Sequence, residues 1–118
     1  MTSEEFCQVI EIPYKTLNTW IDNGIIRAER VAGRPGRGGF GREFGPEHVA
    51  RARVLKALLA RRVPYAELRN RPDLFAAEYL VIDGRRVRAC EDAAAAIGAA
   101  SKARHRCAVI DLSAIKQA

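Results

Sequence analysis

The chain has 118 residues, a hydrophobic fraction of 48% and a formal net charge of +6 at pH 7. This length suits one domain, or one domain with a small appendage, and this apolar content excludes wholesale disorder. No apolar run approaches the roughly 20 residues of a membrane span. Glu4 and Glu5 stand where a secretory signal would be basic, so a cytoplasmic protein without membrane contact is predicted.

The first helix is predicted to begin at Ser3, whose hydroxyl can cap the N-terminus. Glu4 and Glu5 fall in the first turn, where negative charge suits the helix dipole. The residues predicted to face the interior recur at helical spacing and are Phe6, Val9 and Ile10.

A second helix is predicted over residues 13–23. Pro13 suits the first helical position because it lacks an N–H, and Gly24 suits the end because glycine enters the left-handed conformation freely. The residues expected to face inward are Leu17, Trp20 and Ile21. The polar side chains can hydrogen-bond to bases and phosphates, as those of a recognition helix do, although an ordinary solvated face is the alternative for any one of them. The candidate DNA-binding residues are Tyr14, Lys15, Thr16, Asn18 and Thr19.

An arginine- and glycine-rich hairpin is predicted next. Ile25 and Ile26 begin a short strand, residues 33–39 form a tip too rich in Gly and Pro to pack a core, and residues 40–44 lead back. Arginine forks match phosphate geometry, and a hairpin directly after a helix-turn-helix favours a DNA-binding wing over a flexible loop without a partner. The wing is predicted over residues 30–42, and its candidate DNA contacts are Arg30, Arg34, Arg37 and Arg42.

Positive charge is concentrated in the middle of the chain. Residues 24–71 carry a net charge of +8, against −3 for residues 1–23 and +1 for residues 72–118. A positive field over the wing and the following helix is typical of a protein that binds a polyanion, here duplex DNA. Its affinity should therefore fall steeply as salt rises.

A third helix is predicted from Pro46 to about Arg62, since Pro46 and Glu47 favour a helix start. Its inward residues are expected to be Val49, Ala52, Leu55, Leu58 and Leu59. Pro64 ends this helix, and a short helical turn follows over residues 65–70. Pro72 marks a boundary, because a proline disfavours helix at the residue before it, and the DNA-binding domain is predicted over residues 1–71.

Residues 72–118 change to a β-rich pattern. The elements predicted there are a strand over 79–82, a type I′ turn at Asp83-Gly84, a strand over 85–90, a helix over 93–103 capped by Asp92, and a strand over 107–112. So short a unit buries little surface alone, so it either completes a monomeric core or, as is favoured, packs on a second copy to form a homodimer. The predicted fold class is mainly α with small β (α+β): an N-terminal winged helix-turn-helix followed by a small ββαβ unit.

The sequence contains no catalytic or cofactor-binding pattern. His48 and His105 lack a triad-like partner, and the hairpin glycines match neither a P-loop nor a dinucleotide fingerprint. Cys90, Cys107 and His105 match no common zinc spacing, and with Cys7 the cysteines are interpreted as reduced thiols. A non-enzymatic protein without cofactor or metal is predicted.

The first 71 residues resemble the winged-helix DNA-binding domain of the mercury-resistance regulator (MerR) family. The residues that carry the resemblance are Thr16-Leu17, Trp20, Gly24-Ile25-Ile26, then Phe40, Arg42 and Phe44 of the return strand, and the helix pair over residues 49–65. The resemblance implies a cytoplasmic bacterial transcription regulator that binds inverted repeats as a dimer. The residues that it implies as DNA contacts are Lys15, Asn18, Thr19, Arg34, Arg37 and Arg42. The family's usual turn glycine is Glu11 or Ile12 here, and a β-rich unit replaces its long dimerisation helix.

The same signature is similar to that of phage and plasmid excisionases, which are small winged-helix proteins that bend DNA for a recombinase. The favoured prediction is a sequence-specific double-stranded DNA-binding transcriptional regulator, with residues 13–23 in the major groove and the wing on the backbone. The alternatives are an excisionase-like architectural factor and a protein-interaction module whose working surface is residues 72–118.

Overall fold

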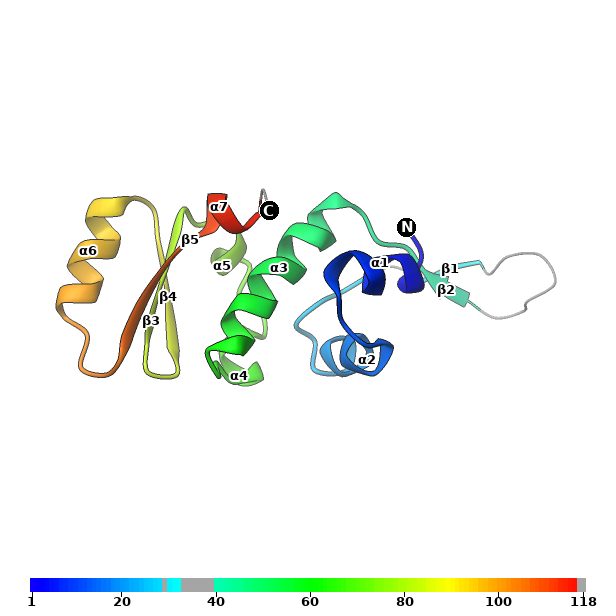
Figure 1. Ribbon diagram of the computed structural model, residues 1–118, viewed down its shortest axis with the longest axis horizontal. Helices are drawn as coiled ribbons and strands as arrows, with labels where there is room; N and C mark the ends of the chain where they lie inside the picture. The colour runs from blue at the N-terminus through cyan, green and yellow to red at the C-terminus, as the bar shows by residue number, and fades with distance from the viewer. Residues whose placement is uncertain (29, 33–39, 117–118) are drawn as a thin grey trace. The chain divides into compact units, whose positions relative to one another are not determined.

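The computed structural model describes residues 1–28, 30–32 and 40–116 (Figure 1). In chain order the elements are α1 (Ser3–Ile10), α2 (Tyr14–Asp22), β1 (Arg30–Ala32), β2 (Phe40–Arg42), α3 (Pro46–Ala60), α4 (Tyr65–Leu68), α5 (Asp73–Ala76), β3 (Tyr79–Asp83), β4 (Arg86–Cys90), α6 (Ala93–Ser101), β5 (Cys107–Asp111) and α7 (Leu112–Lys116). The chain folds as two compact units, Met1–Ala52 and Arg53–Ala118. The predicted fold class is confirmed, because a mostly helical N-terminal region precedes a three-stranded antiparallel sheet with a helix. None of the described helices is both long and apolar enough to cross a membrane.

Helix α1 is capped one residue earlier than predicted. The Thr2 hydroxyl accepts the Glu5 N–H at 3.2 Å, so Ser3 lies inside the helix. Its buried residues are Phe6, Cys7 and Ile10. The prediction that Val9 faces inward is wrong, since its side chain is 45% exposed. Val9 lies about 100° around the helix from Ile10, which is at the middle of the buried stripe.

Helix α2 follows a tight turn. Glu11 ends α1 in the left-handed conformation, with φ 62° and ψ 51°, and is one of the two positions at which the MerR resemblance places a glycine. Pro13 is the N-cap of α2 rather than its first residue. Leu17 and Trp20 are buried as predicted, and Gly24 has the predicted positive φ, of 70°. The buried face of α2 was therefore predicted from Leu17 and Trp20, and its end from Gly24.

The strand predicted to begin at Ile25 and Ile26 begins at Arg30 instead. Both isoleucines are buried, at 5% and 2% exposure. A half-buried strand turns successive side chains to opposite faces, so two consecutive buried residues fit an irregular segment that closes the core after Gly24. The predicted hairpin itself is present, because β1 pairs antiparallel with β2 from Arg30 opposite Arg42 to Ala32 opposite Phe40.

An aromatic stack closes the core of the first unit. The rings of Phe6 and Phe44 are parallel to within 15°, with centroids 4.3 Å apart. The Phe44 N–H also donates to the Met1 carbonyl at 2.9 Å. The stack joins α1 to the segment that leaves the hairpin, although the two residues lie far apart in the sequence.

Helix α3 is close to its predicted length, and Pro64 caps the predicted short helix α4. Of the predicted inward residues of α3, Ala52, Leu55 and Leu58 are fully buried, whereas Val49 and Leu59 are half-buried. The short helices α5 and α7 were not predicted.

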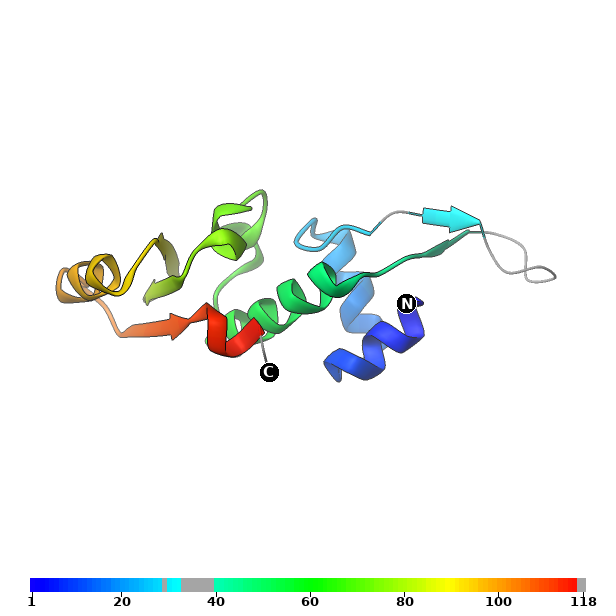
Figure 2. The same ribbon diagram turned by 90° about the horizontal axis from the view of Figure 1, so that it is seen from above.

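The second unit is built on a sheet with strand order β4-β3-β5 and antiparallel pairing throughout. Helix α6 lies on one face of this sheet and α5 on the other (Figures 1 and 2). Val81, Cys90 and Ala96 form the core between α6 and the sheet. As predicted, Asp92 caps α6, and its carboxylate accepts the Ala95 N–H at 2.8 Å, but the helix ends at Ser101 rather than at residue 103.

The predicted turn at Asp83-Gly84 has a different type and register. Asp83 pairs with Arg86, so Gly84 and Arg85 are the central residues. A type I′ turn needs positive φ at both, but only Gly84 has it, at 62°. Glycine at the first central position is the requirement of a type II′ turn instead.

Arg71 ties three elements of the second unit together. Its guanidinium donates to the Asp73 carboxylate at 3.1 Å, to the Val87 carbonyl at 3.2 Å and to the Glu67 carbonyl at 3.5 Å. The hydrogen bond from Arg71 holds the pKa of Asp73 below its usual value and raises that of the guanidinium. This single side chain therefore positions α4, α5 and β4.

Candidate nucleic-acid interface

Helix α2 presents a polar outer face. Tyr14, Lys15 and Asn18 are exposed, with Tyr14 at 60% exposure. Leu17 and Trp20 are buried on the other side of the same helix. The apolar residues therefore orient α2 so that its donors and acceptors point out of the core.

The two threonines predicted as contacts are less available. Thr16 and Thr19 are half-buried. The Thr19 hydroxyl donates to the Lys15 carbonyl at 3.0 Å, and the Asn23 amide donates to the Thr19 carbonyl at 2.8 Å. The Thr19 hydroxyl proton is thus used inside the helix, and the oxygen keeps only accepting capacity.

The base of the hairpin is held by two side chains that reach the segment between α2 and β1. The half-buried Arg42 donates from Nη1 to the Ala28 carbonyl at 3.0 Å. His48 donates from Nε2 to the Arg27 carbonyl at 2.8 Å, and its Nδ1 accepts the Gly45 N–H at 2.9 Å. Because an N–H can only donate, Nδ1 is the unprotonated nitrogen and Nε2 carries the proton. These bonds set where the hairpin leaves the helix-turn-helix.

His48 is a structural residue of the site that was not predicted from the sequence. It lies at the third position of α3, where a side chain that accepts the N-cap N–H completes half of a capping box. Its ring also meets Phe44 edge-on, with centroids 5.5 Å apart. The spacing of Gly45 and His48 around Pro46 was the available signal, but Glu or Gln is the usual residue there.

The predicted wing contacts divide by position. Arg30 lies in β1 directly opposite Arg42 of β2, so the backbone places both at the hairpin base. Arg34 and Arg37, with the predicted tip over residues 33–39, lie outside the described residues.

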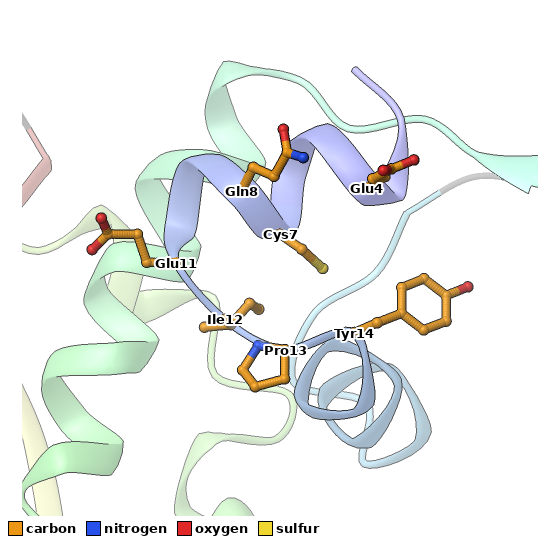
Figure 3. Close-up of a pocket in the computed structure, with 7 residues that line it drawn as sticks. All are labelled: Glu4, Cys7, Gln8, Glu11, Ile12, Pro13 and Tyr14. Atoms are coloured by element: carbon orange, nitrogen blue, oxygen red, sulfur yellow. The ribbon is translucent and has the colours of Figure 1, made fainter.

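An apolar groove lies between α1 and the start of α2 (Figure 3). It has a volume of about 600 Å³ and is lined by Glu4, Cys7, Gln8, Glu11, Ile12, Pro13 and Tyr14. The Cys7 sulfur points into the space between the two helices, and burial raises the pKa of its thiol. The thiol therefore stays protonated, which argues against a reactive cysteine.

Comparison with protein families decides the identity of the first part of the chain. The family described as MerR HTH family regulatory protein matches residues 1–71. The chain belongs to the MerR HTH family. Membership indicates a DNA-binding transcriptional regulator, and a MerR HTH regulatory domain is typically non-enzymatic. Comparisons with curated proteins and with solved structures gave no match.

The part of this MerR-family chain that the structure describes holds no group of three or more His, Cys, Asp or Glu side chains placed to bind a metal ion. Cys90 pairs with Tyr79 and Cys107 with Asp83, at opposite ends of β3. Four residues along a strand separate these positions by about 13 Å. The two thiols are therefore too far apart to share one zinc ion.

Proposed function

We propose that the chain is a sequence-specific double-stranded DNA-binding transcriptional regulator that inserts α2 into the major groove. The observation that carries this proposal is the exposed polar face of α2, in a MerR-family helix-turn-helix followed directly by a paired hairpin. Lys15 and Asn18 point away from the buried Leu17 and Trp20. Asn18 is suited to a bidentate contact with adenine, and Lys15 to guanine or phosphate.

The start of α2 is suited to phosphate. No side chain caps the first turn, because Pro13 stands at the N-cap position. The positive end of the helix dipole is therefore not neutralised by a carboxylate there, and Tyr14 and Lys15 flank it. In the proposed complex this turn lies against the backbone, while Asn18 and Thr19 lie deeper in the groove.

The hairpin supplies the remaining backbone contacts in this proposal. Arg30, Arg34, Arg37 and Arg42 are proposed to grip the flanking phosphates or the adjacent minor groove. Arg42 has a second role, since its bond to the Ala28 carbonyl holds the hairpin base. We further propose that residues 1–71 form the DNA-binding domain, and that residues 72–118 form the contact through which two copies bind one site.

Selection of bound fragments from random duplexes, followed by footprinting, tests this function. Two protected half-sites related by a dyad are expected of a dimeric regulator. Asn18→Ala should cost about 1–3 kcal/mol and relax the preference at one base position. Lys15→Ala should weaken binding to all sequences. Arg88→Ala, which removes one exposed positive charge from the other unit, is the control, and both variants are measured on a duplex with one half-site so that contact between two copies does not enter.

Two outcomes would contradict the proposal in different ways. Half-sites in direct repeat, occupied head-to-tail, would indicate the excisionase-like architectural factor instead. An equal loss of affinity in Lys15→Ala and Arg88→Ala, with no sequence preference in the wild type, would show that only net charge attracts the chain to DNA.

A further inference from the structure

The outer side of α6 is an exposed apolar surface. Ala93, Ala94 and Ile97 are all exposed, and Ile97 is 70% exposed. Residues 93, 97 and 101 recur every four positions and so lie along one side of the helix. The opposite side, with Ala96, packs on the sheet (Figures 1 and 2). Within the described part of the chain, an isoleucine at the centre of a helix face is thus left mostly uncovered.

The edge strand β5 continues this surface. Val109 is 48% exposed and is paired with Val81. Paired residues of neighbouring strands project to the same face of the sheet, and Val81 is in the core under α6. Val109 therefore lies on the α6 side of the sheet, at the edge where none of the strands that the structure describes pairs with β5 other than β3.

Charges flank the apolar surface with opposite sign at its two ends. Glu91 and Asp92 are exposed at the start of α6, and Lys102 and Arg104 are exposed at and after its end. Among the residues that the structure describes, none of these four side chains forms an ion pair. Ile97 is midway between the two ends, five residues from both Asp92 and Lys102.

We propose that this surface, α6 with the Val109 edge, binds the same surface of a second copy, with the two α6 helices antiparallel about a two-fold axis at Ile97. In that arrangement the acidic end of each helix faces the basic end of the other, and the two helix dipoles oppose. The surface is thus complementary in charge to itself. The inference deepens the proposed function and rests on its dimeric mode, since it names the surface that joins the two copies.

The size of the surface sets the strength of the association. A nine-residue helix is about 14 Å long, so this contact buries less than the roughly 800 Å² per partner of a standard interface. The free protein is therefore expected to dimerise only at micromolar or higher concentration. Two half-sites on one duplex raise the effective concentration and make the contact visible as cooperativity.

Paired charge reversals test the proposal. One variant carries Glu91→Lys with Asp92→Asn, which keeps a capping side chain at position 92. The other carries Lys102→Glu with Arg104→Glu. Each variant alone places like charges opposite one another, so its dimerisation measured by sedimentation equilibrium should weaken at least tenfold. An equimolar mixture should recover wild-type association as a heterodimer, because both ends are again complementary.

A second pair of variants separates the apolar contact from general effects. Ile97→Glu should weaken dimerisation at least tenfold without unfolding the chain, because the side chain is already exposed. Val9→Glu also replaces an exposed apolar side chain with glutamate, but in α1, and should leave the dimerisation measured by sedimentation equilibrium unchanged. Circular dichroism checks that each variant is folded.

Three results would overturn the proposal. The first is that the wild type stays monomeric both free in solution and on a duplex with two half-sites. The second is that each charge-reversal variant alone dimerises like the wild type. The third is that the equimolar mixture of the two variants does not recover wild-type dimerisation. Binding to a duplex with one half-site is measured in parallel. If the wild type did not bind this duplex, the DNA-binding function would be refuted, whereas the dimerisation measured by sedimentation equilibrium would still test the α6 surface.

Discussion

His48 provides the sharpest test of how the helix-turn-helix and the hairpin are joined. His48→Ala removes the acceptor for the Gly45 N–H, the donor to the Arg27 carbonyl, and the edge-on contact with Phe44. Each net hydrogen bond contributes about 0.5–1.5 kcal/mol and the ring contact about 0.5–1.5 kcal/mol. The free energy of unfolding should therefore fall by about 1.5–4.5 kcal/mol, a large share of the roughly 5–15 kcal/mol of a small domain.

Urea unfolding followed by circular dichroism measures this loss, with His48→Gln as the matched variant. Glutamine at the third helical position can accept the Gly45 N–H in a capping box, but it does not rebuild the ring contact with Phe44. His48→Gln should recover about 1 kcal/mol of the loss. Hydrogen exchange at the Gly45 amide should be fast in His48→Ala and slow in His48→Gln.

The expected effect on DNA is indirect. The bond from His48 to the Arg27 carbonyl holds the hairpin base together with Arg42 and the strand pairing, so its removal loosens that base. Affinity for a selected duplex should fall in His48→Ala although the side chain is 17% exposed and points at protein atoms. A loss of stability below about 0.5 kcal/mol, with unchanged exchange at Gly45, would refute this account of the joint.

Three further expectations concern backbone conformation and one ion pair. Glu11→Gly should raise the free energy of unfolding by about 0.5 kcal/mol, because glycine relieves the strain of the left-handed conformation at some entropic cost. A Glu11→Ala variant as stable as Glu11→Gly would contradict this. Gly84→Ala should lower the thermal midpoint of unfolding, because the φ of Gly84 is 62°. Gly98→Ala should raise the midpoint, because Gly98 is in mid-helix with open space around it. Shifts of the same sign in the two variants would contradict the backbone conformations described at these glycines. Arg71→Ala should cost about 1–3 kcal/mol at pH 7. Because Arg71 lowers the folded-state pKa of Asp73, the part of that cost due to Asp73 is present above about pH 3.9 and disappears as pH falls through the folded-state pKa. Urea unfolding of the wild type and Arg71→Ala at pH 7 and at pH 3 measures this difference. An equal cost at both pH values would argue against the ion pair.

Local features of the chain were predictable where a single residue is clearly the best suited to one structural role. Gly24 ends α2 because it adopts positive φ, and Asp92 begins α6 because its carboxylate accepts an early N–H. The third helix followed from a proline start and an apolar face. Errors arose where two residues could serve equally, as with Thr2 and Ser3 at the cap of α1.

Contacts between distant residues were not predictable in the same way. The stacking of Phe6 on Phe44 and the bond from His48 to the Arg27 carbonyl depend on how the chain returns, which periodicity does not describe. The hairpin turn of the second unit shows the same limit on a smaller scale. The pairing register moved the turn by one residue, so that Gly84 came first and the turn type changed.

The distribution of charge within the first unit bears on how the proposed complex is oriented. Residues 1–23 carry a net charge of −3, and Glu4 and Glu11 border the apolar groove between α1 and α2. Phosphates repel such a rim, whereas the exposed Lys15 and the arginines of the hairpin attract them. The α1 side of the groove, with Glu4 and Glu11, is thus less suited to the DNA backbone than the exposed Lys15 is. The buried residues of α2 and the carboxylates of α1 therefore favour the same orientation, with the start of α2 against the backbone, Asn18 toward the major groove, and Glu4 and Glu11 turned from the phosphates.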